Sequence, residues 1–418
     1  MLLSLVGAAC TGSDQAVPST TTPSEPIEFE TLPPVAEVVT TEVGTGPSPD
    51  SLPLATPIEP VLATIDGPIP ASVEAFSFAA PSVVDFAGLP LTDIAVSPSD
   101  RWIAINRQTE ICLLDPSIGS ESSDEGCVDF AGSIAPGSLA WSPDESAVAF
   151  AHDWPQEPDI GVLDVASQSF AVLTEDGAET AGFDVAPFYS EDGTLHFLRS
   201  GPDPFSFNII EFGDTPITLG SLEAEGFPSS ARRDPVGGII IVEVGGARFT
   251  SIETIDLVEG TSTLIEGEID SINRRPFLDV IDGRALVGQN SIPEVNGIRA
   301  ALIDLRGDAL PRALPSMPAG SGRGVVGVGL SPDGTAIMMI IADVTDPLGH
   351  QLVVAPILDD GSVGPLSVIA TGEQFAPNNG DKTIRPHGLG VQQEIIWTSD
   401  KIVFGLGPNQ IVTLDLGS

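Results

Sequence analysis

Basic side chains are scarce in this sequence. Sixteen Lys and Arg residues stand against 59 Asp and Glu residues, and its lysines are Lys382 and Lys401. The resulting formal net charge of −43 at pH 7 repels phosphate backbones and anionic lipid headgroups, which excludes nucleic-acid binding and direct electrostatic membrane docking. Basic proteins and divalent cations are still compatible with this charge as binding partners, although the simplest role of the acidic residues is to keep the surface hydrated.

Recognisable catalytic motifs are also missing. The sequence has no Gly-x-Ser-x-Gly nucleophile elbow, no Walker loop and no metalloprotease helix motif. Acidic strings such as 153–159 and 343–346 could bind a structural Ca²⁺, but turns account for them equally well. We therefore predict no catalytic residue, no metal ligand and no cofactor. An enzymatic function is the less favoured interpretation.

The histidines and tryptophans offer few candidates for chemistry. The four histidines have no paired spacing, although two of them follow apolar runs at similar places and could converge on one axis: His152, His196, His350 and His387. Ordinary histidines at strand ends are the simpler interpretation. Trp102, Trp141 and Trp397 stand beside turns and are expected to pack in the core, whereas Trp154 is the candidate for exposed recognition.

The first ten residues form an apolar run of small and aliphatic side chains that ends at Cys10. This run resembles the lipobox of bacterial lipoproteins, and the resemblance implies cleavage before Cys10 and lipid attachment to its sulfur. The protein would then be anchored to the outer face of a bacterial membrane, or secreted, and would touch the membrane only through the lipid. An apolar N-terminus with a chance cysteine is the alternative.

Residues 11–71 are rich in Pro, Thr, Ser, Val and Glu and lack basic residues. Such a segment cannot bury enough apolar surface to offset the entropy of ordering, and its prolines favour extended conformations. We predict an N-terminal signal remnant over 1–10, a disordered acidic tether over 11–71 and one globular domain over 72–418. The 44 Gly and 38 Pro of the chain suit many short strands separated by turns.

Three segments of the globular domain share one pattern, in which an apolar strand, a turn with serine and proline, and a second apolar strand follow one another. They are 91–106, 139–152 and 327–342. Ser at the first turn position, Pro at the second and Gly at the fourth are preferences of type I turns, so each segment predicts a hairpin. Their turn residues are Ser97, Pro98, Ser142, Pro143, Asp144, Ser331, Pro332, Asp333 and Gly334, and a weaker copy over 183–200 adds Asp192 and Gly193.

Weaker copies extend the pattern along the chain. Anchored at the first turn residue, the copies begin at Ser97, Ser142, Ser190, Asp234, Val280, Ser331 and Thr398. Third and fourth strands follow most anchors, and four strands in about 45 residues are typical of a propeller blade. We predict an all-β propeller of about seven four-stranded blades, with six or eight as alternatives. Because the last blade stops after its third strand, residues 72–88 are expected to supply its fourth.

Two of the hairpins carry a family resemblance. The run 141–144 before 148–150, and the run 331–334 before Ile337, resemble the WD40-like PD40 repeats of TolB-type β-propellers. The resemblance implies an architecture and leaves the function open, because such repeats occur in many unrelated proteins.

Cys112 and Cys127 remain as an even pair once Cys10 is set aside, which predicts a disulfide in an exported protein. Together these features predict a monomeric, non-catalytic extracytoplasmic lipoprotein whose propeller binds a protein, peptide or glycan of the cell envelope. The alternative is a propeller hydrolase or lyase with a metal on the axis, which would bring histidines or acids together there.

Overall fold

The computed structural model divides the chain into two compact units, Met1–Ile58 and Glu59–Ser418. The residues that it describes all belong to the second unit. They are 65, 68–69, 82–85, 91–115, 126–154, 157–174, 182–200, 206–213, 215–223, 227–233, 239–245, 249–256, 261–270, 277–281, 283–289, 299–305, 312–318, 321–343, 349–375, 395–405 and 410–416.

The described residues of the second unit form seven antiparallel sheets of four strands each. Blade 1 contains β2 (Asp93–Val96), β3 (Ile103–Asn106), β4 (Glu110–Leu114) and β5 (Cys127–Asp129). Blade 2 contains β6 (Ala140–Trp141), β7 (Ala147–His152), β8 (Asp159–Asp164) and β9 (Ser169–Val172). Blade 3 contains β10 (Asp184–Tyr189), β11 (Leu195–Ser200), β12 (Ser206–Glu211) and β13 (Ile217–Glu223).

The next three blades repeat this order. Blade 4 contains β14 (Phe227–Arg233), β15 (Ile239–Gly245), β16 (Phe249–Asp256) and β17 (Thr261–Asp270). Blade 5 contains β18 (Phe277–Ile281), β19 (Arg284–Gln289), β20 (Arg299–Asp304) and β21 (Arg312–Ala313). Blade 6 contains β22 (Arg323–Leu330), β23 (Ala336–Asp343), β24 (Gln351–Pro356) and β25 (Ser367–Thr371), and the short helix α1 (Gly372–Phe375) follows it.

The last sheet, blade 7, combines strands from near the two ends of the described chain. It contains β26 (Ile395–Trp397), β27 (Lys401–Gly405), β28 (Gln410–Asp415) and β1 (Ser82–Asp85). Strand β1 runs antiparallel to β28, with Ser82 opposite Thr413 and Asp85 opposite Gln410. This is the pairing expected of the segment 72–88, and it gives β28 a neighbour on the side that would otherwise be an open edge.

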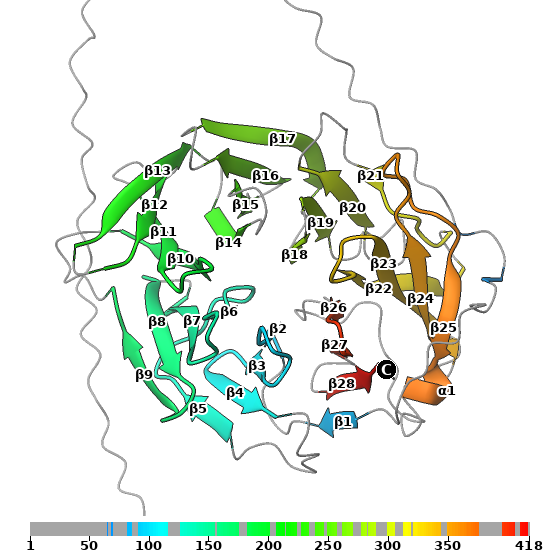
Figure 1. Cartoon of the computed structure of the whole chain (residues 1–418), viewed down its shortest axis with the longest axis horizontal. Helices are drawn as coiled ribbons and strands as arrows, with labels where there is room; N and C mark the ends of the chain where they lie inside the picture. The colour runs from blue at the N-terminus through cyan, green and yellow to red at the C-terminus, as the bar shows by residue number, and fades with distance from the viewer. Residues whose placement is uncertain are drawn as a thin grey trace, which may run out of the picture. The chain divides into compact units, whose positions relative to one another are not determined.

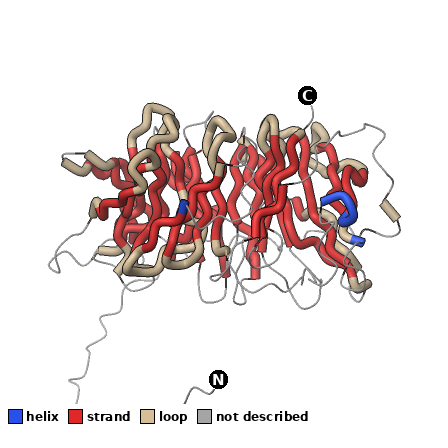
Figure 2. The backbone as a smooth tube through the Cα atoms, turned by 90° about the horizontal axis from the view of Figure 1, so that it is seen from below, coloured by secondary structure: helices blue, strands red, loops and turns tan. Residues whose placement is uncertain are grey.

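The sheets follow one another around a ring, with the first strand of each blade toward the centre and the fourth at the periphery (Figure 1). The architecture is therefore an all-β propeller of four-stranded blades, as the repeat pattern predicts. Seen from the side, the strands cross the thickness of the ring and their connections lie at its two ends (Figure 2).

The hydrophobic core lies between the faces of neighbouring blades. Second strands are apolar on both faces because each blade has a neighbour on either side, and β23 is buried over all but its end residues. Val148 and Phe150 of blade 2 pack with Ile111 of blade 1, and Phe404 of blade 7 packs with Met338 of blade 6. At about 25 cal/mol per Å² of buried apolar surface, these interfaces supply most of the cohesion of the ring.

The second compact unit, Glu59–Ser418, includes residues that precede the first strand. Ile65 and Ile69 pack against the core of blades 5 and 6, and the Ile65 amide donates to the Ser316 carbonyl at 2.9 Å. Val280, taken as a turn anchor, lies inside β18, because this strand continues to Ile281, which pairs with Arg284 at the start of β19.

Candidate functional site

The serine of each turn organises the hairpin that follows it. In blade 6 the Ser331 hydroxyl donates to Asp333 Oδ1 at 2.6 Å and accepts from the Ala336 amide at 2.8 Å. The Gly334 amide donates to the Ser331 carbonyl at 2.8 Å, and Gly334 has a φ of 65°. Pro332 stands at the second position, where its fixed φ suits a type I turn. The turn is thus closed by both its main chain and its side chains.

The same arrangement recurs in other blades. Ser142 Oγ donates to Asp144 Oδ1 at 2.7 Å, and Ser190 Oγ donates to Asp192 Oδ1. Ser97 Oγ accepts from the Trp102 amide at 3.0 Å. Hydrogen bonds from the serine hydroxyls lower the pKa of Asp144 and Asp333, and lower that of Asp192 to about 2. These residues stand in separate turns and fold the hairpins.

Ser142→Ala should weaken this turn. The substitution removes the acceptor of the Ala147 amide, 3.0 Å away, and the donor to Asp144, which we expect to cost about 1 kcal/mol of unfolding free energy. Ser167→Ala is the matched control, because the exposed Ser167 hydroxyl shares Asp164 with its own amide and its loss should cost less than about 0.5 kcal/mol. Urea unfolding of both variants measures the difference, and equal stabilities would contradict the proposed role of Ser142.

Aspartates on the inner strands connect neighbouring blades. Asp93 is 3% exposed, and its carboxylate accepts from its neighbour, the Ile94 amide, at 2.9 Å and from the Leu139 amide of blade 2 at 3.1 Å. Asp279 of blade 5 accepts from the Leu330 amide of blade 6 at 3.2 Å. Trp141 Nε1 completes the contact between blades 1 and 2 by donating to the Ala95 carbonyl at 3.0 Å.

Burial dominates the titration of these two carboxyl groups. It raises the pKa of Asp93 and of Asp279 to about 6 each, although main-chain donors and the positive charge of Arg232 act in the opposite direction. Arg232 belongs to β14, the inner strand of blade 4. The inner strands therefore bring acids from blades 1 and 5 within the electrostatic range of one arginine.

Our sequence prediction missed these aspartates, although a repeated sequence pattern could have indicated them. An aspartate followed by a β-branched residue occurs in the first strand of three blades, as Asp93-Ile94, Asp184-Val185 and Asp279-Val280. In blade 3, Asp184 instead binds Arg199 of the adjacent strand through two hydrogen bonds of 2.7 and 2.6 Å.

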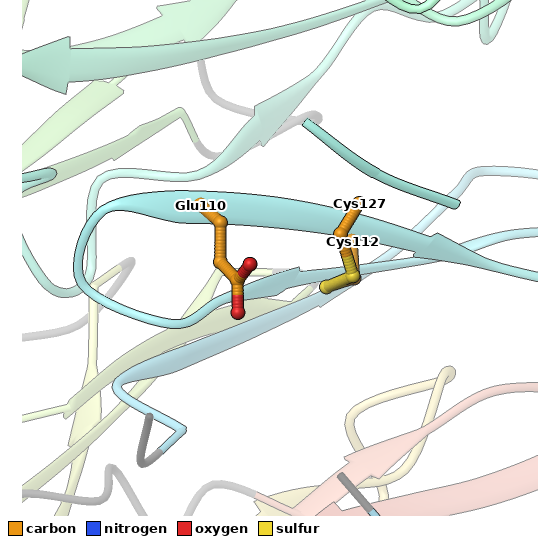
Figure 3. Close-up of side chains that lie close together, drawn as sticks. All are labelled: Glu110, Cys112 and Cys127. Carbon is orange, nitrogen blue, oxygen red and sulfur yellow. A yellow bond between two sulfur atoms is a disulfide. The ribbon is translucent and has the colours of Figure 1, made fainter. Parts of the chain in front are cut away.

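The cysteine pair is part of a compact polar cluster. Cys112 of β4 and Cys127 of β5 face each other across the strands and are joined by a disulfide. Glu110 lies two residues before Cys112, on the same side of β4 (Figure 3). The side chain of Arg107 is 2% exposed, pairs with Glu110 at 2.8 Å and reaches Cys112 Sγ at 3.9 Å. Among the described residues, Glu110, Cys112 and Cys127 form the one group whose donor atoms could share a metal ion.

Opening the disulfide should cost stability. A cross-link that closes about 15 residues contributes about 3 kcal/mol in the chain-entropy model, so a Cys112→Ser and Cys127→Ser double variant should unfold at a lower urea concentration than the oxidised protein. Peptide mapping without reductant should recover the two cysteines in one cross-linked pair. Recovery of two free thiols from protein purified under oxidising conditions would contradict the pairing.

The structure separates the other candidate residues. His152 is the last residue of β7, whereas His196 is the second residue of β11, so the two histidines stand at opposite ends of equivalent strands, and the alternative in which they converge on one axis does not hold. His350 lies in blade 6, between β23 and β24. Its Nδ1 accepts a hydrogen bond from the Asp343 amide at 3.0 Å. Cys10 and His387 lie outside the described residues.

Three of the four tryptophans pack against the core as the sequence predicts. Trp102 and Trp141 pack against the core between blades 1 and 2, and Trp397 packs against that of blades 6 and 7. Trp154 is half-buried and packs against the core of blade 3, so it is less exposed than a recognition platform would be. No helix in the described part of the chain is long and apolar enough to span a membrane.

The two ends of the propeller differ in their connections. At one end, which we call the turn end, first and second strands are joined by two to six residues. At the other end, which we call the crossover end, the outer strand of one blade leads to the inner strand of the next through three to 23 residues. The longest of these crossovers joins β25 to β26, and by sequence it contains Lys382.

Comparisons with solved structures agree with this architecture. The chain matches "Structure of U3-55K" with a TM-score of 0.50 and 12% identity, over 81% of this chain and 98% of that one. It matches "Crystal structure of RRP9 WD40 repeats" with a TM-score of 0.50 and 11% identity, over 82% of this chain and 100% of that one. The fold is a WD40-like β-propeller. No protein-family model and no curated protein sequence matches the chain.

Proposed function

We propose that this protein is a non-catalytic binding scaffold of the bacterial cell envelope, whose propeller holds a protein partner at its crossover end. The observation that carries the proposal is the WD40-like ring of four-stranded blades. A closed ring of packed blades is a rigid support, and binding residues of such scaffolds concentrate on the loops that the support positions. This is an inference from the fold to the kind of function.

The crossover end is favoured because its connections vary most in length. At the other end the turns between first and second strands are short, and several are closed by their own serine and aspartate side chains, which leaves these turns little capacity to adapt to a partner. The acidic surface favours a partner that presents basic groups, since charge complementarity speeds association.

The scarcity of lysine makes this proposal directly testable. Lys382 belongs to the longest crossover, whereas Lys401 opens β27 beside the turn end and donates to the Asp100 carbonyl. An amine-reactive photo-crosslinker on the purified protein therefore attaches to the amines of Lys382 and Lys401 and to the N-terminal amine. After incubation with envelope extract and irradiation, we expect partner peptides to be captured through Lys382.

The matched controls are Lys382→Arg and Lys401→Arg, which keep each positive charge and remove each reactive amine. Capture should disappear in the first variant and persist in the second. Capture through Lys401 alone would overturn the choice of end, and the absence of any specific partner would overturn the binding function. Purified protein that turned over a carbohydrate or lactone substrate would show a catalytic function instead.

The location is proposed from Cys10. A lipid on this sulfur, followed by the acidic tether of residues 11–71, would carry the propeller clear of the membrane surface. Cells that express the full-length gene should incorporate an alkyne-labelled fatty acid into the protein, and Cys10→Ser should abolish the label. Equal labelling of both forms would contradict the anchor without bearing on the propeller's binding function.

A further inference from the structure

We propose that reduction of the Cys112–Cys127 disulfide converts this cluster into a binding site for one thiophilic divalent cation such as Zn²⁺. The two sulfur atoms and a carboxylate oxygen of Glu110 would be the protein ligands. The site is independent of the proposed partner binding, because its three protein ligands all lie within blade 1.

The register of the strands brings the three ligands together. Cys112 and Cys127 occupy directly opposite positions of β4 and β5. Side chains two residues apart on a strand point to the same face, so Glu110 and Cys112 project together, as Figure 3 shows. One donor atom from each of the three residues lies within 4.8 Å of the other two, and small side-chain rotations can bring all three onto a single ion.

The ligand set selects the kind of metal. Two thiolates favour soft or borderline ions, and Zn²⁺ accepts sulfur and carboxylate oxygen together in tetrahedral geometry. Three protein ligands leave a fourth position for water. Hard cations such as Mg²⁺ and Ca²⁺ prefer all-oxygen surroundings and should bind this cluster weakly.

Arg107 balances the charge of the cluster in both redox states. In the oxidised protein the guanidinium and the Glu110 carboxylate neutralise each other at 2.8 Å, and the disulfide is neutral. With a divalent cation and two thiolates added, the total charge is again zero. A buried cluster without net charge avoids the desolvation cost of an uncompensated ion, so the arginine is compatible with the metal.

The conversion requires an external dithiol reductant. The disulfide takes up two electrons and two protons from the dithiol, which becomes a disulfide itself, and two protein thiols result. The cation then displaces one proton from each thiol to solvent. Cys112 is 1% exposed, whereas Cys127 is half-buried, so we expect the reductant to attack Cys127 and the cation to enter from its side.

Cobalt titration of the full-length protein tests the site. The protein is reduced with a phosphine in anaerobic, chelator-treated buffer and titrated with Co²⁺. We expect one equivalent to produce a near-ultraviolet thiolate-to-cobalt charge-transfer band, which Zn²⁺ then removes and Mg²⁺ does not. The oxidised protein should give no band, since its sulfurs are joined to each other.

Three variants make the assignment specific. A Cys112→Ser and Cys127→Ser double variant should give no band, and Glu110→Gln should weaken Co²⁺ affinity at least tenfold. Glu191→Gln removes an exposed carboxylate from a turn of blade 3 and should leave the affinity unchanged. A band that persists without the cysteines, or no band in the reduced wild type, overturns the proposal. If reduction alone unfolds the chain, added Zn²⁺ must restore its near-ultraviolet circular dichroism, and failure to do so overturns it equally.

Discussion

Gly329→Ala should be among the most destabilising single substitutions in this protein, with an expected loss of about 3 kcal/mol of unfolding free energy. Gly329 lies on β22, the inner strand of blade 6, next to β26 of blade 7. A methyl group at this position would overlap the main-chain carbonyl oxygen of Ile395 and lie 2.9 Å from its carbonyl carbon. Because the obstacle is backbone, rotation of a side chain cannot relieve it.

We expect the protein to accommodate the Gly329→Ala methyl group by moving the two inner strands, β22 and β26, apart. Blades 6 and 7 share a core in which Val326, Met338 and Ile340 pack with Ile395 and Phe404. Moving β26 outward to accept the methyl group would loosen these contacts, and close-packed interiors tolerate such displacement poorly. The cost should therefore appear as a lower urea midpoint with an unchanged dependence on denaturant.

Gly220→Ala is the matched control for this substitution. Gly220 also lies within a strand, β13, but a methyl group there would meet the Ile209 side chain at an ordinary 3.8 Å. Its stability should change by less than about 0.5 kcal/mol. Equal stabilities of the two variants would show that blades 6 and 7 do not approach as closely as described.

The sequence predicted what depends on short-range rules. The hairpins of blades 1, 2 and 6 follow from serine and proline at fixed turn positions, and the structure confirms them through the bonds of Ser97, Ser142 and Ser331. The turn of blade 5 was misplaced at Val280 because it lacks the serine and proline that mark the others.

The candidate site depends on contacts that local patterns do not encode. Asp93 meets the Leu139 amide, 46 residues away, because two inner strands are brought together by the closure of the ring. A solvated acidic turn and a buried aspartate that bridges two blades look alike in the sequence. The same is true of Arg107, which is buried beside a disulfide although arginine is usually exposed.

Stability should fall as the pH rises from about 4 to about 6, because of the two inner-strand aspartates whose pKa is raised. In the folded protein the pKa of Asp93 and of Asp279 is about 6, against an ordinary 3.8. A group whose pKa is raised by folding binds its proton more tightly in the folded state, so its ionisation favours unfolding. For Asp93 the change amounts to roughly 2 kcal/mol between pH 3.8 and pH 6.

The turn aspartates act with the opposite sign and in another range. The folded pKa of Asp192 is about 2, so its contribution to stability is present above 3.8 and is lost as the pH falls toward 2. Asp144 and Asp333, whose pKa values are also lowered, act in the same direction. Taken by themselves, the two classes of aspartate favour a maximum of stability near pH 4, below the neutral range where many proteins are most stable.

Asp93→Asn isolates the buried group. The amide cannot ionise, and it offers one oxygen acceptor where the carboxylate accepts from both Ile94 and Leu139. The variant should therefore be less stable at pH 4.5 but should lose much less stability than the wild type between pH 4.5 and pH 7. Asp144→Asn, which removes a turn carboxylate titrating below this range, should keep the wild-type slope. Urea unfolding at several pH values measures both, and an unchanged slope in Asp93→Asn would show that Asp93 is ionised throughout and that the inner strands carry a fixed negative charge.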